Sequence, residues 1–245
     1  MINSSVSDGV ATLELNRPEV RNALNRELCQ QLVETLEAWS ERDDVRAVIL
    51  CGAGDKAFAA GADIAELKER THKQSFLAWT QRMLQTVEDF PRPVIAAIDG
   101  YALGGGLELA LACDLRVASA GAKVGLPEVS LGIFPSAGGT WRLPRLVGLG
   151  RAKELIFTGR ILDAREANAL GLFEALVETD SRGEALRLAK AIAANDPLAV
   201  QVAKVALNAA ARVQQAPVEW LGQGLLFDSP EKQRRMTAFL EKKKK

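Results

Sequence analysis

The sequence predicts an α/β protein, and three observations support this. Residues 11–15 alternate apolar and polar side chains, as a half-buried strand does. Apolar runs of strand length at 45–51 and 94–98 are separated and followed by segments with helical patterns. The chain has 245 residues, enough to bury a substantial core. Apolar strands that alternate with helices favour a buried sheet covered by helices.

The elements of the N-terminal half can be placed in order. Asn25 is a suitable N-cap for a helix, because apolar residues recur after it as one stripe at Leu28, Leu32, Leu36 and Trp39. A loop is expected over 52–61, and a helix is expected to open near Ala62. The remaining segments of this half are expected to be a helix over 75–90 and strands over 115–118 and 123–126.

Past about residue 138 the pattern becomes mainly helical. Ser229-Pro230-Glu231 begins the last helix with an N-cap, a proline at the first helical position and an early acid. A soft boundary between 180 and 200 divides the chain into residues 1–190 and 191–245. The other expected elements are helices over 151–158, 163–171, 182–194 and 198–214, and one strand over 173–177.

Composition excludes several classes of function. The 31 basic residues balance the 31 acidic ones, which argues against a dedicated nucleic-acid or membrane-surface protein. No apolar run reaches membrane-spanning length, and the first residues lack a signal-peptide layout, so we expect a cytoplasmic protein. Three cysteines without metal-ligand spacing and a single histidine predict neither a metal site nor a Ser–His triad.

The most informative segment runs from Ile98 to Glu108. An apolar strand leads into three consecutive glycines, Gly104 to Gly106, and then into a helical stretch. Glycines at such a turn let backbone N–H groups approach a ligand at a helix N-terminus. Glu108 follows Gly105 by about one turn, so a carboxylate is expected to face those donors. Taken alone, the glycines are equally consistent with close packing.

Two further segments carry chemistry. Glu128 stands alone as a charge in the apolar run 124–135, and residues 57–64 form a small-residue loop that can offer another free amide. These three segments, in this order, resemble the crotonase (enoyl-CoA hydratase/isomerase) superfamily, and its enoyl-CoA hydratases most closely. The resemblance extends from Asn16-Arg17-Pro18 and Asn22-Ala23-Leu24, through FAAGADI and GYALGGGLELALACD, to LPEVSLGIFPSAGGTWRLPRLVG and a helix of the 229–245 type.

The resemblance implies a spiral of repeated ββα units with a C-terminal helical trimerisation region. Residues 1–190 would form the spiral core with the active site. Residues 191–245 would mediate assembly into a homo-oligomer, a trimer or a hexamer, and cover the active site. The implied reaction adds water to a trans-2-enoyl-CoA, as in fatty acid β-oxidation. No metal or redox cofactor is implied, since coenzyme A arrives as part of the substrate.

The resemblance also implies roles for individual residues. The N–H groups of Ala62 and Gly105 would form an oxyanion hole for the thioester, while Glu108 and Glu128 would hold the water between them. Two positions depart from the common pattern. Ala65 replaces a lysine that many hydratases carry, so a cation for the 3′-phosphate must come from elsewhere, for example from a neighbour's C-terminal lysines. Ser136 replaces a glycine, and its side chain would either narrow the acyl pocket or contact the water. The residues implied to contact the substrate are Arg21, Ala23, Leu24, Ala60, Asp63, Ile64, Ala65 and Ser136.

Alternative functions remain open at this point. Isomerisation of the double bond is one, and hydration of a branched acyl-CoA is another. Isomerases of the superfamily generally need one carboxylate, so the presence of both Glu108 and Glu128 favours water addition. RNA binding by a hydratase-like protein would call for a basic and aromatic patch, which the neutral composition does not indicate. A catalytically inactive assembly subunit is disfavoured by the intact glutamate pair.

Overall fold

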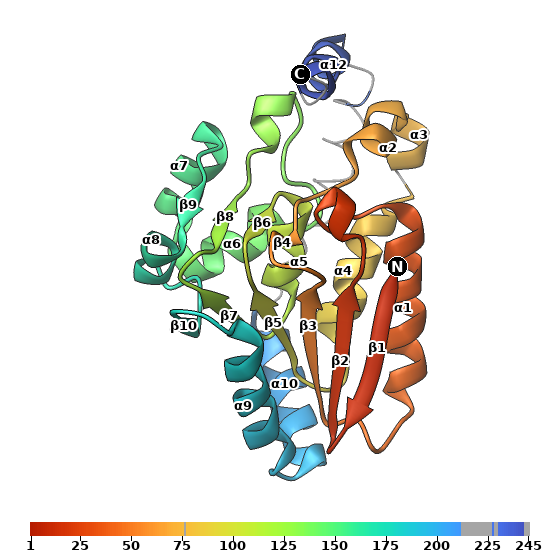
Figure 1. The fold of residues 1–245 in the computed structure, drawn as a ribbon, viewed down its shortest axis with the longest axis vertical. Coiled ribbons are helices and arrows are strands. Elements are labelled where there is room, and N and C mark those ends of the chain that lie inside the picture. The colour runs from red at the N-terminus through yellow and green to blue at the C-terminus, as the bar shows by residue number, and fades with distance from the viewer. Residues whose placement is uncertain (76, 212–226, 228–229, 243–245) are drawn as a thin grey trace.

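The larger of two sheets has the strand order β1-β2-β3-β5-β7-β10 (Figure 1). The computed structural model describes residues 1–75, 77–211, 227 and 230–242. Strand β1 is antiparallel to β2, and every other neighbouring pair in this sheet is parallel. The strands are β1 (Ile2–Ser7), β2 (Val10–Leu15), β3 (Ala47–Gly52), β5 (Val94–Ile98), β7 (Leu115–Ser119) and β10 (Ala175–Val177).

Both faces of this sheet are buried, because alternate side chains point to opposite sides. Val48 and Leu50 of β3 belong to the main core, which also holds the apolar faces of α1 (Arg26–Ser40) and α4 (Trp79–Asp89). Ile49 of β3 lies on the other side, where it packs in a second core with α9 (Ser181–Ala193). The sheet is therefore sandwiched between helices, as the apolar strands predict.

The smaller sheet has the order β4-β6-β8-β9. Most of its strands alternate along the chain with strands of the larger sheet. The successive pairs β3 and β4, β5 and β6, and β7 and β8 each place one strand in each sheet, and a helical segment follows each pair. This is the spiral of ββα units that the resemblance implies. The new elements are β4 (Ala57–Ala59), β6 (Tyr101–Leu103), β8 (Lys123–Gly125), β9 (Leu162–Asp163), α2 (Ile64–Glu69), α5 (Gly105–Ala112), the 3-10 turn η2 (Glu128–Leu131) and α6 (Gly139–Val147).

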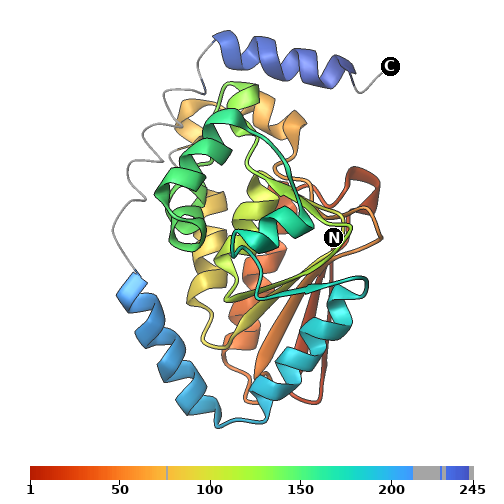
Figure 2. The ribbon, with the colours of Figure 1, turned by 90° about the vertical axis from the view of Figure 1, so that its left-hand side faces the viewer.

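The last described helix, α12 (Pro230–Lys242), lies across one end of the molecule (Figure 2). It contacts α2 and η2, the two segments that follow β4 and β8. Among the described residues, no helix combines the length and apolar character needed to cross a membrane. The remaining elements are η1 (Pro18–Val20), α3 (His72–Ser75), α7 (Leu149–Thr158), α8 (Ala164–Ala169) and α10 (Pro197–Ala211).

Helices with a side-chain cap follow the prediction well. Asn25 Oδ1 accepts a hydrogen bond of 2.9 Å from Leu28 N at the start of α1, and Asp163 caps α8 in the same way. The helix expected over 75–90 is shorter, since α4 starts at Trp79. Of the helix expected over 198–214, residues 212–214 lie outside the described part, as does Ser229 of the last helix.

Several strands were not predicted. The segment expected to be a loop over 52–61 contains β4, and the helix expected near Ala62 begins at Ile64. Strands β1, β6 and β9 had no counterpart in the expected order, and β10 covers only three of the residues 173–177. Strands of two or three residues form because the neighbouring strand supplies hydrogen-bond partners, a cause that local periodicity does not register.

Close packing between α5 and β4 makes Gly106 a position where any side chain must clash. A Cβ at Gly106 would lie 2.0 Å from Ala59 O. We expect Gly106→Ala to lower the free energy of unfolding by about 3 kcal/mol, the upper end of the usual cost of overpacking. Urea denaturation would measure it. Gly121→Ala is the matched control, because nothing lies within 4 Å of a Cβ there. Equal stability of the two variants would contradict this account.

Candidate active site

Three candidate groups lie just beyond the carboxyl ends of neighbouring strands. Strands β4, β6 and β8 run parallel in adjacent positions, so their carboxyl ends meet at one edge of the small sheet. Ala62 follows β4, Gly105 follows β6, and Glu128 follows β8. The repeated unit of the spiral therefore delivers one group from each turn to the same place.

The N–H groups of Ala62 and Gly105 are close together and available. Leu24 pairs with the residues on either side of Ala62: Leu24 N donates to Gly61 O at 2.8 Å, and Asp63 N donates to Leu24 O at 3.0 Å. Gly105 is the first residue of α5, whose N–H has no partner within the helix. A Cβ at Gly105 would lie 3.6 Å from Ala62 N. Within the described part of the chain, neither N–H donates a hydrogen bond.

Gly104 gives the turn its shape. Its φ of 52° and ψ of −126° lie in a region essentially restricted to glycine. Gly104 N donates to Gly125 O at 2.9 Å, and Gly104 O accepts from Glu108 N at 2.9 Å. A Cβ at this position would lie 3.2 Å from Glu128 Oε1. The backbone angles therefore require glycine here, and a Cβ would also crowd the Glu128 carboxyl.

Glu108 is a buried carboxyl held by backbone donors. Its side chain is 3% exposed, and its Oε1 accepts hydrogen bonds from Ala137 N at 2.8 Å and Gly139 N at 2.9 Å. Burial raises the pKa of Glu108 above its ordinary value. The two amides and the positive charge of Arg142 oppose that rise. Both described acceptor contacts involve Oε1, which leaves Oε2 as the oxygen that can bind a reactant.

Glu128 lies on the other side of the glycine turn. It is the first residue of η2 and is half-buried, so it is not the fully exposed turn residue that its position after Pro127 would also allow. Its carboxyl lies against Gly104, the residue whose carbonyl accepts from the Glu108 backbone. Gly104 thus joins the Glu128 carboxyl to the start of the helix that carries Glu108, and the adjoining Gly105 lies beside Ala62 N.

The backbone of the segment expected to contact coenzyme A is anchored to the loop before Ala62. Ala60 N donates to Arg21 O at 3.0 Å, and Ala23 O accepts from Arg17 Nη1 at 2.6 Å. The Leu24 side chain is buried, 1% exposed, and contributes to packing. Its Cδ1 lies 3.6 Å from where a Gly105 Cβ would be.

Arg21 is exposed, and its guanidinium lies 5.7 Å from the centre of the Tyr101 ring. With Lys56 and Lys123 it lines a pocket of about 280 Å³ that also includes Asp55. Sequence reasoning did not include the two lysines, whose approach to Arg21 depends on the pairing of β4, β6 and β8.

The remaining expected contacts have mixed roles. Asp63 caps α2 by accepting from Ala65 N at 3.2 Å, and its carboxylate pairs with Arg17 at 3.2 Å. Ile64 joins an apolar cluster, and Ala65 is exposed. Ser136 O accepts a hydrogen bond from Gln81 Nε2. Asp63 and Ser136 are therefore tied into the scaffold of the site through these contacts.

Sequence reasoning also missed an apolar cluster that packs against Ala62. Phe227 and Met236 pack with Leu67 and Ile133, and Ala62, Ile64 and Leu131 border them. The cluster joins α2, η2 and α12, which are far apart in the sequence. No spacing within one segment could indicate it.

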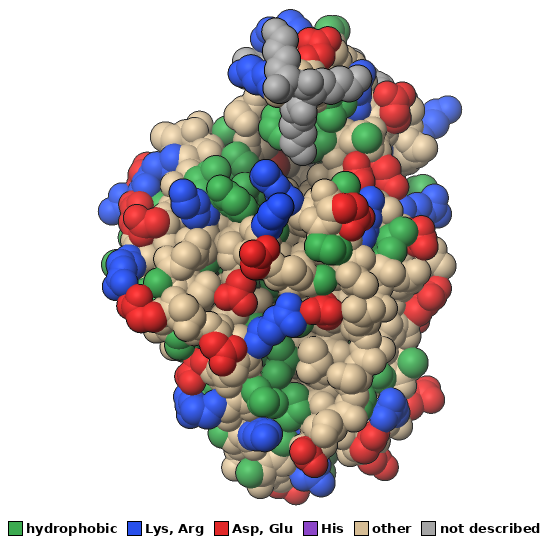
Figure 3. Space-filling model, in the orientation of Figure 1, with side chains coloured by type: hydrophobic (Ala, Val, Ile, Leu, Met, Phe, Trp, Pro, Cys, Tyr) green, Lys and Arg blue, Asp and Glu red, His purple; other side chains and the backbone are tan. Residues whose placement is uncertain are grey.

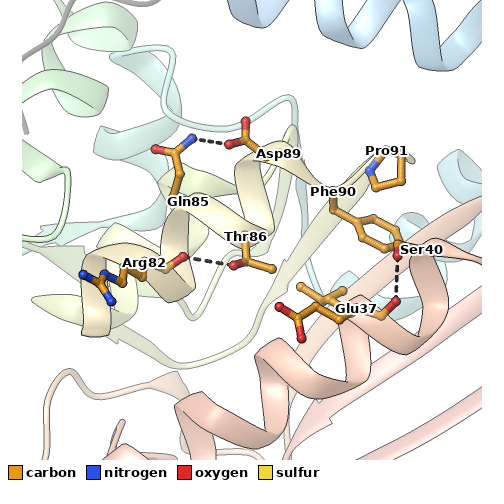
Figure 4. Close-up of a pocket in the computed structure, with 9 residues that line it drawn as sticks. Glu37, Ser40, Arg82, Gln85, Thr86, Asp89, Phe90 and Pro91 are labelled. Carbon is orange, nitrogen blue, oxygen red and sulfur yellow. Dashed lines mark hydrogen bonds between the residues drawn. The ribbon is translucent and has the colours of Figure 1, made fainter. Parts of the chain in front are cut away.

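A second pocket, of about 370 Å³, lies between α1 and α4 (Figure 4). The polar side chains in it bond mainly within their own helices: Gln85 Nε2 donates to Asp89 at 2.8 Å and Thr86 Oγ1 to Arg82 O at 3.0 Å. None of the candidate site residues lines it. The described residues also include no cluster of three histidine, cysteine or acidic side chains able to hold a metal ion.

The buried carboxyl makes a prediction about stability. Because folding raises the pKa of Glu108, this group destabilises the fold increasingly as the pH rises from about 4.5 through the raised value. Glutamine keeps the acceptor oxygen without the charge. We expect Glu108→Gln to exceed the wild type in stability at mildly alkaline pH and to lose that advantage as the pH falls toward 4.5, measured by urea denaturation. The control Glu184→Gln, where a hydrogen bond from Arg187 lowers the pKa, should show no gain.

Comparison with known proteins identifies the family of the chain. Residues 5–245 match the family described as enoyl-CoA hydratase/isomerase. The chain is 40% identical to the crotonyl-CoA hydratase of Syntrophomonas wolfei, covering 96% of this chain and 93% of that protein. It is 41% identical to the short-chain-enoyl-CoA hydratase of Clostridium acetobutylicum, covering 96% and 92%. An enoyl-CoA hydratase structure from Bacillus anthracis aligns with a TM-score of 0.83 at 40% identity, covering 98% and 96%. The chain belongs to the enoyl-CoA hydratase/isomerase family and is an enzyme of this kind.

Proposed function

We propose that the protein hydrates trans-2-enoyl-CoA thioesters to 3-hydroxyacyl-CoA. The observation that carries the proposal is the pair of free amides at Ala62 and Gly105, with the Glu128 carboxyl against the adjoining Gly104. The buried carboxyl of Glu108 belongs to the helix that starts at Gly105. The two amides are suited to bind a developing oxyanion, and the two carboxyls are suited to transfer protons during the addition of water. No bound cofactor is part of the proposal, since the residues themselves supply both functions.

In this mechanism the N–H groups of Ala62 and Gly105 bind the thioester carbonyl oxygen. Polarising that carbonyl draws electron density from the double bond and makes C3 electrophilic. Each such donor typically stabilises a transition state by about 2.7–4 kcal/mol. The half-buried position of both residues gives a substrate access to the donors.

Glu108 and Glu128 then act on one water molecule. Glu108 orients the water and accepts a proton from it through Oε2 as the oxygen bonds to C3, and Glu128 delivers a proton to C2. The two carboxyls together carry one proton before the reaction and one after it.

Short acyl chains are the expected substrates, supported by the names of the two relatives above. By the same resemblance, the side chain of Ser136 in place of a glycine would narrow the acyl pocket and favour a smaller acyl group. Coenzyme A would extend along Arg21 and Ala23 and beside residues 60–65. Arg21, Lys56 and Lys123 are the proposed partners for its phosphates, in place of a lysine at position 65. Of the C-terminal lysines considered from the sequence, residues 243–245 lie outside the described part.

Isomerisation of a 3-enoyl-CoA is the second candidate, because the matching family includes isomerases by its description. Hydration of crotonyl-CoA removes the ultraviolet absorbance of the conjugated thioester, whereas isomerisation of a 3-enoyl-CoA creates that absorbance. A panel of linear and branched enoyl-CoAs, in which both loss and gain of this absorbance are recorded for each substrate, separates these activities. Conversion of a 3-enoyl-CoA without hydration of any 2-enoyl-CoA would show that the protein is an isomerase and would overturn the proposal.

RNA binding receives no support from the charge distribution. Basic and acidic side chains are interspersed over the face shown in Figure 3, and the whole sequence has no net charge. The cytoplasmic location, the role in β-oxidation and the division at residue 190 stay predictions.

Loss of either carboxyl should impair turnover. We expect Glu108→Gln and Glu128→Gln each to lower kcat by roughly 10²-fold or more on crotonyl-CoA, the usual contribution of general acid–base catalysis. The steady-state hydration assay measures this. Glu154→Gln, on α7, where Glu154 is half-buried and pairs with Arg151, serves as the control and should keep wild-type kcat. Wild-type turnover in both active-site variants would refute the assignment.

We further propose a homo-oligomer, a trimer or a hexamer, assembled in part through α10. The inner side of this helix is fixed: Lys204 Nζ donates to Asp114 at 2.7 Å and to Arg92 O at 3.1 Å. Its outer side carries Leu198, Val202 and Val205 at helical spacing, each more than half exposed. An ordered helix with an apolar outer stripe favours contact with a second copy of the chain.

A charge in this stripe should weaken the assembly. We expect Val205→Glu to shift the mass measured by light scattering or sedimentation toward the monomer, because a charge is costly in an apolar contact. Gln30→Glu, on the exposed side of α1, is the control and should leave the mass unchanged. An unaltered oligomer in Val205→Glu would exclude this face from the interface.

A further inference from the structure

The turn 137–139, which donates hydrogen bonds to Glu108, is itself hydrogen-bonded to side chains of α4 and α6. Arg142 of α6 donates from Nη1 to Ala137 O at 3.0 Å, and its Nη2 pairs with Glu88 of α4 at 2.5 Å. Gln81, also of α4, donates to Ser136 O in the same turn. The opposite side of the turn points two N–H groups at Glu108 Oε1. The contacts thus run from α4 through Arg142 and the turn to the buried carboxyl.

Burying Arg142 costs more free energy than packing alone would justify. It is 4% exposed, Glu88 is 14% exposed, and Arg142 Nε is buried without a hydrogen-bond partner among the described residues. A buried ion pair often stabilises a fold no better than apolar side chains of similar volume, and an unsatisfied buried donor adds a further cost of about 1–3 kcal/mol. An apolar residue would fill this space without that cost. The charge of Arg142 therefore requires another explanation.

We propose that Arg142 is a positioning residue for the hydration reaction: anchored by Glu88, it fixes the turn 137–139 against the carboxyl of Glu108 that accepts the proton of water. The inference rests on the proposed function and adds to it a group that contacts neither the substrate nor the water.

The charges around Glu108 agree in sign with this role. Arg142 lowers the pKa of Glu108 and partly offsets the effect of burial. On α4, Glu88 neutralises part of the positive charge of Arg142. Arg145 of α6 interacts electrostatically with Glu88 and with Arg142. The turn η2 contributes Glu128. Strand β4 has no titratable residue, and β6 has only Tyr101, at the end remote from Gly105.

The sign of a pH shift tests the proposal. In Arg142→Met, Glu108 should ionise at higher pH, so the acidic limb of the kcat/KM profile should move up by roughly one pH unit. In Glu88→Gln the guanidinium loses its counter-charge, so the same limb should move to lower pH. A merely structural role would reduce activity in both variants and shift neither limb.

Controls keep the test decisive. Arg151→Gln removes a cation from the exposed surface of α7 and should leave the profile unchanged. If Arg142→Met does not fold, the double variant Glu88→Gln/Arg142→Met removes both charges together, and its acidic limb should still lie above that of the wild type. An unshifted limb in a folded Arg142 variant overturns the inference. Absence of hydration by the wild type would instead overturn the proposed function.

Discussion

The structure depends on the close approach of backbones at Gly104, Gly105 and Gly106. Gly106 packs directly against Ala59 O, Gly105 lies beside Ala62 N, and Gly104 adopts backbone angles that suit no other residue. A side chain is excluded at Gly106 by contact and at Gly104 by the backbone angles, whereas a Cβ at Gly105 would make only ordinary contacts. Together the three glycines bring the start of α5 to the end of β4, and so place two amides that belong to different units of the spiral next to each other.

The spiral explains how distant parts of the chain meet there. Its strands alternate between two sheets, so each turn advances one position in both and ends at the same edge of the smaller sheet. Ala62, Gly105 and Glu128 occupy equivalent places after successive strands. The sequence has no detectable internal repeat, yet the geometry repeats, because strand pairing and helix packing constrain the backbone more tightly than the side chains.

The sequence predicts those features whose cause is local. The cap at Asn25 and the apolar stripe of α1 need only neighbouring residues. Strands β4 and β6 could not be predicted in that way, since three residues such as Ala57-Phe58-Ala59 become a strand only beside a partner. The glycine turn and Glu108 stand out by composition, whereas the association of Glu108 with Glu128 came from resemblance to a family. Arg142 had no signal, because its contacts join α4, α6 and the turn.

In the proposed mechanism, the burial of Glu108 has to be balanced against its basicity. A carboxyl in a fully apolar setting would remain protonated and could not accept a proton from water, while a solvated one would be a weak base. Two amides on a single oxygen reduce the cost of the charge without occupying the second oxygen. A guanidinium behind the turn adds a field in the same direction without direct contact. The carboxyl can therefore stay buried and ionisable, provided that the turn between Ala137 and Gly139 is rigid. That requirement explains why the turn is anchored to two helices that carry no reacting group.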